Sequence, residues 1–195
     1  MLLLLLVVAV VMAIFYKKRI DTPQEYVDHL RFIERYSTEV DYLVINPKGK
    51  YREKAMLFYS SKAGHRLEIG EERVLLYKKE GITVQDLKNN KSYELKSDYD
   101  EFYRWAFIRD FIALIYTNEE VKIYSKEKEG KIYLFIELYI PGGNKHIHKG
   151  ILQVNTETKA PEQLSIYDSD GGLRAEITYL NFKFEKELDE KLFNY

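Results

Sequence analysis

The segment KIYLFIELYIP, residues 131–141, constrains the fold more than any other part of the sequence. Read with the two-residue period of a β-strand, it has an aliphatic face and a second face that is almost entirely aromatic. The aliphatic face holds Ile132, Leu134, Ile136, Leu138 and Ile140, and the second face holds Tyr133, Phe135, Glu137 and Tyr139. A strand that is exposed on one side alternates apolar with polar residues, so this pattern predicts a central strand of a curved sheet with each side covered.

Alternating runs of the same kind fill most of the sequence, and turns rich in Gly, Asn and Pro separate them every 8–12 residues or so. This spacing is typical of an antiparallel meander, and it predicts about 10–11 strands. The expected strands cover 39–46, 51–61, 65–69, 73–79, 82–88, 91–96, 119–127, 131–140, 148–157, 162–168 and 173–184. In the last strand the apolar parity changes, which predicts either a bulge near Leu180–Asn181 or burial of the strand's other face.

Two helical regions interrupt the strands, so the fold class is α+β. The sequence Thr22-Pro23-Gln24-Glu25 combines a capping box with proline at the first helical position, and it predicts a helix to about residue 36. A second helical region is expected from 97 or 98 to 117, as a core helix or as an apolar lid or docking helix. Its polar residues Arg109 and Asp110 could mark a break into two shorter helices. A short helical turn is expected within 186–195.

Residues 1–16 carry no charge, and Lys17, Lys18 and Arg19 end the apolar run. We interpret 1–19 as a hydrophobic signal anchor, with a cleaved signal peptide or a buried core helix as alternatives. Residues 20–195 are then one domain with 27 basic and 31 acidic side chains, a net charge of about −4. That balance argues against a nucleic-acid partner. The absence of cysteine excludes disulfides, thiolate catalysis and lipid attachment at a lipobox.

No constellation of residues makes a strong case for catalysis or for a metal. His146 and His148 could pair on one strand face but have no third ligand nearby, and Asp168-x-Asp170-Gly171 lacks the later ligands of a calcium loop. Glu137 could be a perturbed carboxylate, although pairing with a cation on a neighbouring strand is the simpler reading. The sequence therefore predicts no cofactor and no enzyme.

The closing segment carries a resemblance to a known family. It reads P-x-x-L-x-I-Y-D from Pro161, an Asp-Gly turn, and R-x-E-I-T-Y-x-N-F from Arg174. Together with the capped helix and the meander, it resembles the LolA-like lipoprotein carriers, a half-barrel fold with helices on the concave face of the sheet. The stretches 59–67, 73–77, 84–89 and 116–120 more narrowly resemble the GerS-type germination lipoproteins of clostridia. This chain lacks their lipobox cysteine, so the hydrophobic segment must replace the lipid anchor.

The resemblance implies an extracytoplasmic, membrane-tethered accessory protein without catalytic residues. Its implied role is to support the modification of spore cortex peptidoglycan, and thereby germination, by binding an envelope amidase or by self-association. The alternative is a lipid or lipoprotein carrier, and a hydrolase that uses Glu137 or the histidine pair is a third hypothesis. We expect the aliphatic face to be the concave one, and candidate cavity residues are Ile132, Leu134, Ile136, Leu138, Trp105, Phe111 and Ile112. The candidate partner surface consists of Tyr133, Phe135 and Tyr139.

Overall fold

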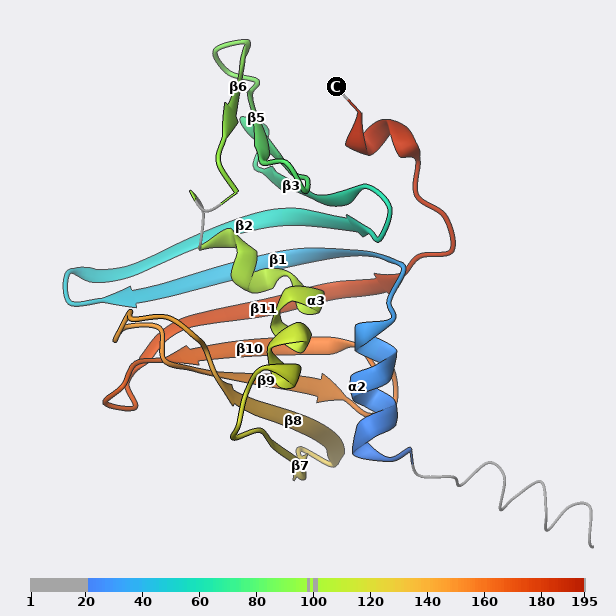
Figure 1. Cartoon of the computed structure of the whole chain (residues 1–195), viewed down its shortest axis with the longest axis vertical. Coiled ribbons are helices and arrows are strands. Elements are labelled where there is room, and N and C mark those ends of the chain that lie inside the picture. The colour runs from blue at the N-terminus through green and yellow to red at the C-terminus, as the bar shows by residue number, and fades with distance from the viewer. Residues whose placement is uncertain (1–20, 98, 100–101, 195) are drawn as a thin grey trace, which may run out of the picture.

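A computed structural model describes residues 21–97, 99 and 102–194 of the chain. Within these residues, eleven strands form one sheet in the order β6-β5-β4-β3-β2-β1-β11-β10-β9-β8-β7 (Figure 1). Every neighbouring pair is antiparallel, which confirms the predicted meander, whereas the predicted curvature of the sheet stays a prediction. The strands are β1 (Arg35–Asn46), β2 (Gly49–Ser60), β3 (Gly64–Ile69), β4 (Arg73–Tyr77), β5 (Ile82–Asp86), β6 (Lys91–Leu95), β7 (Lys122–Lys128), β8 (Lys131–Tyr139), β9 (Lys149–Asn155), β10 (Pro161–Tyr167) and β11 (Leu173–Phe184).

The first described helix, α2 (Pro23–Arg31), begins with the predicted capping box. The Thr22 hydroxyl accepts from the Glu25 amide at 3.3 Å, and the Glu25 carboxylate accepts from the Thr22 amide at 2.7 Å. The helix ends at Arg31 and not near residue 36, so the predicted end was wrong. The reason is that β1 already pairs with β2 from Arg35 onward, which takes the backbone out of the helical conformation.

The predicted long helix over 97–117 was also wrong. The structure has three short pieces instead, namely η1 (Tyr103–Ala106), α3 (Ile108–Ala113) and η2 (Leu114–Tyr116). The first break lies at Phe107, whose backbone is extended, and not at Arg109 or Asp110. Phe107 is 1% exposed, and its ring stacks on His65 with 3.8 Å between centroids. Burial of this ring between sheet residues explains why the helix does not continue through it.

These helical pieces and α2 lie on the same side of the sheet (Figure 1) and enclose the main hydrophobic core against it. Tyrosine hydroxyls of the sheet hold the segment 103–116 in place. Tyr42 donates to the Tyr103 carbonyl and Tyr179 donates to the Ala106 carbonyl, both at 3.2 Å. The predicted bulge is confirmed, because the β1–β11 register shifts next to Leu180 and Asn181 has φ +53°.

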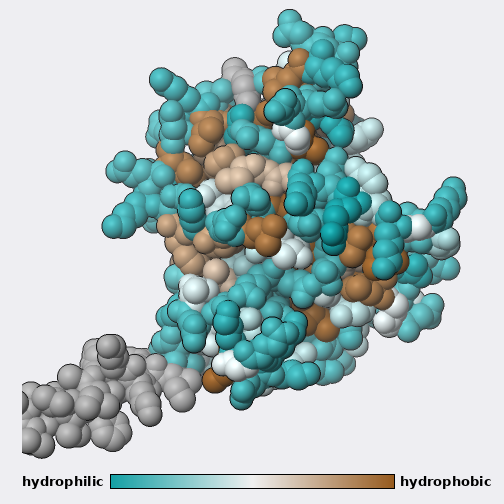
Figure 2. All heavy atoms as spheres, turned by 180° about the vertical axis from the view of Figure 1, so that it is seen from behind, coloured by the Kyte–Doolittle hydropathy of each residue, from teal (hydrophilic) through white to brown (hydrophobic). Residues whose placement is uncertain are grey.

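Strand β8 places its aliphatic face toward these helices. Leu134, Ile136 and Leu138 are at most 1% exposed and belong to the core. Gly150, opposite Leu138 on β9, lets α3 approach closely, because a Cβ there would lie 2.5 Å from the Phe111 ring. The other side of the sheet carries neither α2 nor α3. On this side hydrophilic residues dominate and hydrophobic residues lie in separate groups (Figure 2).

The structure describes the chain from residue 21 at the N-terminal end and to residue 194 at the C-terminal end. The predicted anchor at 1–19 lies outside the described residues, and none of the helices within them is long and apolar enough to span a membrane. At the other end, η3 (Glu190–Phe193) matches the predicted terminal helical turn. Arg66 of β3 donates to the Leu192 carbonyl at 2.7 Å, and Phe193 is 3% exposed. The C-terminal turn is therefore packed onto the sheet.

Candidate functional site

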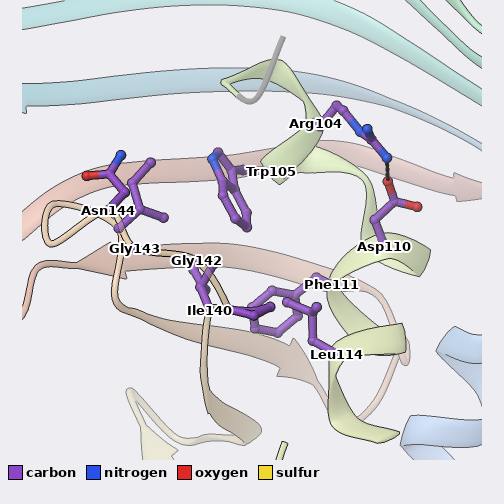
Figure 3. Close-up of a pocket in the computed structure, with 11 residues that line it drawn as sticks. Arg104, Trp105, Asp110, Phe111, Leu114, Ile140, Gly142, Gly143 and Asn144 are labelled. Atoms are coloured by element: carbon purple, nitrogen blue, oxygen red, sulfur yellow. Dashed lines mark hydrogen bonds and ion pairs between the residues drawn. The ribbon is translucent and has the colours of Figure 1, made fainter. Parts of the chain in front are cut away.

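An open pocket of about 480 Å³ lies between the helical segment and one end of the sheet. Figure 3 shows the Trp105 indole projecting from η1 into the space between the Gly142–Asn144 loop and Phe111, with Ile140 and Leu114 beside Phe111. Arg104 and Asp110 form an ion pair of 3.1 Å at the upper rim. The pocket is thus mainly apolar with one charged pair at its edge.

A second pocket of about 400 Å³ adjoins the first, since Trp105, Asn144 and Ile147 line both. Its remaining wall comes from the β1–β2 turn and from apolar residues of β10 and β11, including Ile166 and Ala175. The Trp105 indole N–H is buried without a hydrogen-bond partner in the described structure. The two pockets form one mainly apolar groove with Trp105 at their junction, and we call this the Trp105 groove.

The predicted cavity residues divide between the groove and the core. Trp105 and Phe111 line the first pocket, whereas Ile112 is fully buried and Leu134, Ile136 and Leu138 lie beneath the helices. Ile132 is 54% exposed, because it stands at the start of β8 where no helix covers the strand. The groove residues that the sequence did not single out come from the 141–144 turn, from the end of β1 and Pro47, and from η2, β10 and β11.

The predicted partner surface lies on the side of the sheet without helices. Tyr133 is only 8% exposed, Phe135 is partly exposed and Tyr139 is 41% exposed. Phe135 stacks on Tyr124 of β7 at 5.4 Å, and Lys149 lies 5.5 Å over the ring of Tyr167. We call this surface the β7–β10 face, defined by Tyr124, Phe135, Glu137, Tyr139, Lys149 and Tyr167.

A further exposed cluster surrounds the end of α2, and the sequence did not predict it. Phe32 is 68% exposed, Tyr116 51% and Phe184 39%. The Arg31 guanidinium lies 4.2 Å from the Tyr116 ring centre and 5.2 Å from that of Phe32, and His29 packs against Phe184 at 4.8 Å. We call these five residues the α2-end cluster. The sequence contains no sign of this cluster, because the predicted helix continued through Phe32 to about residue 36.

The candidate chemical groups are occupied by structural partners. Glu137 pairs with Lys149 at 3.4 Å and with Lys122 at 3.8 Å, as the simpler reading predicted. The Asp168 carboxylate accepts from the amides of Asp170 and Gly172 and from Arg174, and these bonds lower its pKa. No group of three or more metal-ligating side chains occurs within the part of the chain that the structure describes.

The model of a protein family described as "Sporulation protein YdcC-like" matches residues 1–193 of this chain. The chain belongs to the YdcC-like family of sporulation proteins. None of the curated proteins matches it. Family membership confirms the predicted link to sporulation.

Solved structures of several proteins are also similar to this chain. The chain is 26% identical to the GerS lipoprotein in the complex with the CwlD amidase from Clostridioides difficile, with 86% of this chain and 99% of that chain covered and a TM-score of 0.51. An uncharacterized conserved protein from Thermus thermophilus shares the fold, with a TM-score of 0.59 at 10% identity. The match covers 90% of this chain and 94% of that chain. A LolA superfamily protein from Nitrosomonas europaea gives a TM-score of 0.44 at 15% identity, with 89% of this chain and 96% of that chain covered.

Proposed function

We propose that this YdcC-like protein is a non-enzymatic accessory protein of the cell envelope during sporulation and that it binds an amidase of the envelope. The observation that carries the proposal is the 26% identity to GerS over most of both chains, since GerS forms a complex with the CwlD amidase. The described residues add support, because Glu137 and Asp168 are engaged in ion pairs and a turn. The expected site of action is extracytoplasmic, on the cortex peptidoglycan of the spore.

The α2-end cluster is the surface that best suits a protein partner. Exposed aromatic residues around an arginine are typical of the few residues that dominate the binding energy of protein interfaces. Here Phe32 and Tyr116 flank Arg31, and Phe184 adjoins them through His29. The rings already stand on a rigid helix end and strand end, so little conformational entropy is lost when a partner covers them.

We expect the double variant Arg31→Glu, Phe32→Ser to weaken binding to the amidase at least tenfold, because it removes a central aromatic group and reverses the charge beside it. Isothermal titration of the full chain with the sporulation amidase of the same organism measures this. Leu87→Ser is the matched control, because Leu87 is 52% exposed in the turn between β5 and β6 and should leave binding unchanged. Absence of binding by the unmodified protein would refute the proposed function, and equal binding by all variants would refute this surface.

A second candidate function is that of an acyl-chain carrier, which the Trp105 groove favours. The groove combines apolar walls with an opening, and its two pockets of about 480 and 400 Å³ are in the size range of small-ligand sites.

If the protein carries acyl chains, lipid should co-purify with the full chain from its native membranes and be detected by mass spectrometry. Ala175→Phe should reduce the bound lipid severalfold, because the larger side chain fills the second pocket that Ala175 lines. Leu87→Ser again serves as control, since it lies outside both pockets. The same small amount of lipid in all three proteins would rule out a carrier function for this groove.

A further inference from the structure

The β7–β10 face has an ordered pattern of side chains that the proposed function does not use. The strand register places Tyr124 opposite Phe135, and two residues further along β8 it places Lys122 opposite Glu137. Another two residues along, Tyr139, Lys149 and Tyr167 lie side by side on β8, β9 and β10. Two outer rows that carry aromatic rings therefore flank the charged Lys122–Glu137 row, and Lys149 stands in one of the outer rows, between Tyr139 and Tyr167; all lie on the side of the sheet without α2 and α3.

The groups of this face are close enough to act together. Lys149 lies 3.4 Å from the Glu137 carboxylate and 5.5 Å from the Tyr167 ring, so it links the charged row to an aromatic row. Tyr124 lies diagonally across from Glu137 in the β7–β8 register, and burial and, next, the Glu137 charge raise the pKa of its phenol. His148 packs on Tyr139 at 5.0 Å and extends the outer aromatic row.

The dimensions of the face indicate a narrow ligand. Phe135 and Tyr139 are four residues apart on β8, so the two aromatic rows are separated by about 13 Å, and the four strands span roughly 14 Å. That footprint is well below the ~800 Å² that a stable interface between folded proteins buries on each side. Because β7 is the last strand of the sheet among the described residues, a long ligand could continue beyond it without obstruction.

The order of the side chains also differs from that of a protein interface. Protein interfaces have an apolar centre and a polar rim, whereas here the charged row is central and the aromatic rows are outside. Aromatic ring faces carry partial negative charge and attract the C–H groups of sugar rings. Glu137 in the middle row could accept hydrogen bonds from hydroxyls, and Lys122 beside it and Lys149 in the outer row could pair with carboxylates.

We propose that the β7–β10 face binds a linear polysaccharide that carries carboxylate groups, with sugar rings on the two aromatic rows and carboxylates at Lys122 and Lys149. A nucleic acid fits less well, because Glu137 lies at the centre and the folded part of the chain is acidic. This binding is independent of the amidase, whose proposed contact lies at the α2-end cluster. Together they would place an envelope enzyme beside its polymer.

The test is co-sedimentation of the full chain in mild detergent with each of two polymers. The first is purified peptidoglycan, and the second is chitin, a polysaccharide without carboxylates. We expect binding to peptidoglycan and at least tenfold weaker binding to chitin. Tyr124→Ser with Tyr139→Ser should weaken peptidoglycan binding about tenfold, because the double variant removes one ring from each outer row. Lys149→Gln should weaken binding to peptidoglycan severalfold and leave the weak chitin binding unchanged.

Tyr93→Ser is the matched control, because Tyr93 is 47% exposed on β6 at the opposite edge of the sheet. Absence of sedimentation with peptidoglycan, or equal sedimentation of the tyrosine variant and the control, would overturn the proposal. Equal binding to chitin would overturn the role of the lysines. If the tyrosine variant lost amidase binding but still sedimented with peptidoglycan, this face would be a protein interface and the proposal would be wrong. If neither the unmodified protein nor any variant bound the amidase, only the proposed function would be refuted.

Discussion

Replacing Gly64 with alanine should lower the free energy of unfolding by about 4 kcal/mol, a large part of the 5–15 kcal/mol that stabilises a typical domain. Gly64 has φ +97°, and an added Cβ would lie 2.1 Å from the carbonyl oxygen of Tyr77. The obstacle is backbone, so it cannot move aside as a side chain could. Relief of the clash requires β3 to separate from β4 where His65 pairs with Tyr77.

Urea unfolding of the full chain, followed by circular dichroism, measures this loss of stability. Gly49→Ala is the matched control, because Gly49 also has a positive φ, +142°, but has no atom within 4 Å of the added Cβ. The control should lose only the cost of the unfavourable backbone angle, about 1–3 kcal/mol. If both variants lost the same stability, the proximity of Tyr77 would have no energetic weight and our account of the β3–β4 junction would be wrong.

The regular parts of the fold could be predicted from the sequence because their signals are local. The capping box at Thr22, the turn spacing and the parity change at Leu180 each depend on a few neighbouring residues. The break at Phe107 depends instead on contacts of its ring with His65 and Tyr77, which are distant in the sequence and become neighbours only in the folded protein. An apolar sequence without Gly or Pro gives no local sign of a break at Phe107, so the break that the sequence suggested was placed at Arg109 or Asp110.

The candidate sites were harder to predict than the strands. The alternation in 131–140 correctly separated an aliphatic from an aromatic side, but exposure within each side depends on which elements cover it. Ile132 and Tyr139 lie at strand ends and are exposed, whereas Tyr133 is buried although it shares the side of Tyr139. The α2-end cluster joins residues from α2, η2 and β11, and its existence depends on α2 ending at Arg31. No pattern within one segment contains that information.

His65 is a buried residue with a chemical consequence that the sequence did not indicate. It is 8% exposed, stacks between Phe107 and Tyr59, and its Nε2 has no hydrogen-bond partner in the described structure. Burial, reinforced by the charges of Arg104 and Arg109, lowers the pKa of the imidazole to about 3. The folded protein therefore keeps His65 neutral under conditions in which an exposed histidine would be charged.

Acid should accordingly destabilise the protein through His65. Between pH 6.5 and about 3 the unfolded chain binds a proton at this residue and the folded chain does not, so stability falls as the pH falls. At pH 5 the expected loss relative to pH 7.5 is about 2 kcal/mol, and near pH 3 it approaches about 4 kcal/mol. Urea unfolding of His65→Phe, which keeps the aromatic stack, should show an acid loss smaller by these amounts. His146→Phe, at an exposed position, should lose as much as the unmodified protein. An equal acid loss in His65→Phe would mean that the carboxylates alone cause it and that His65 can take up a proton without disturbing Phe107 and α3.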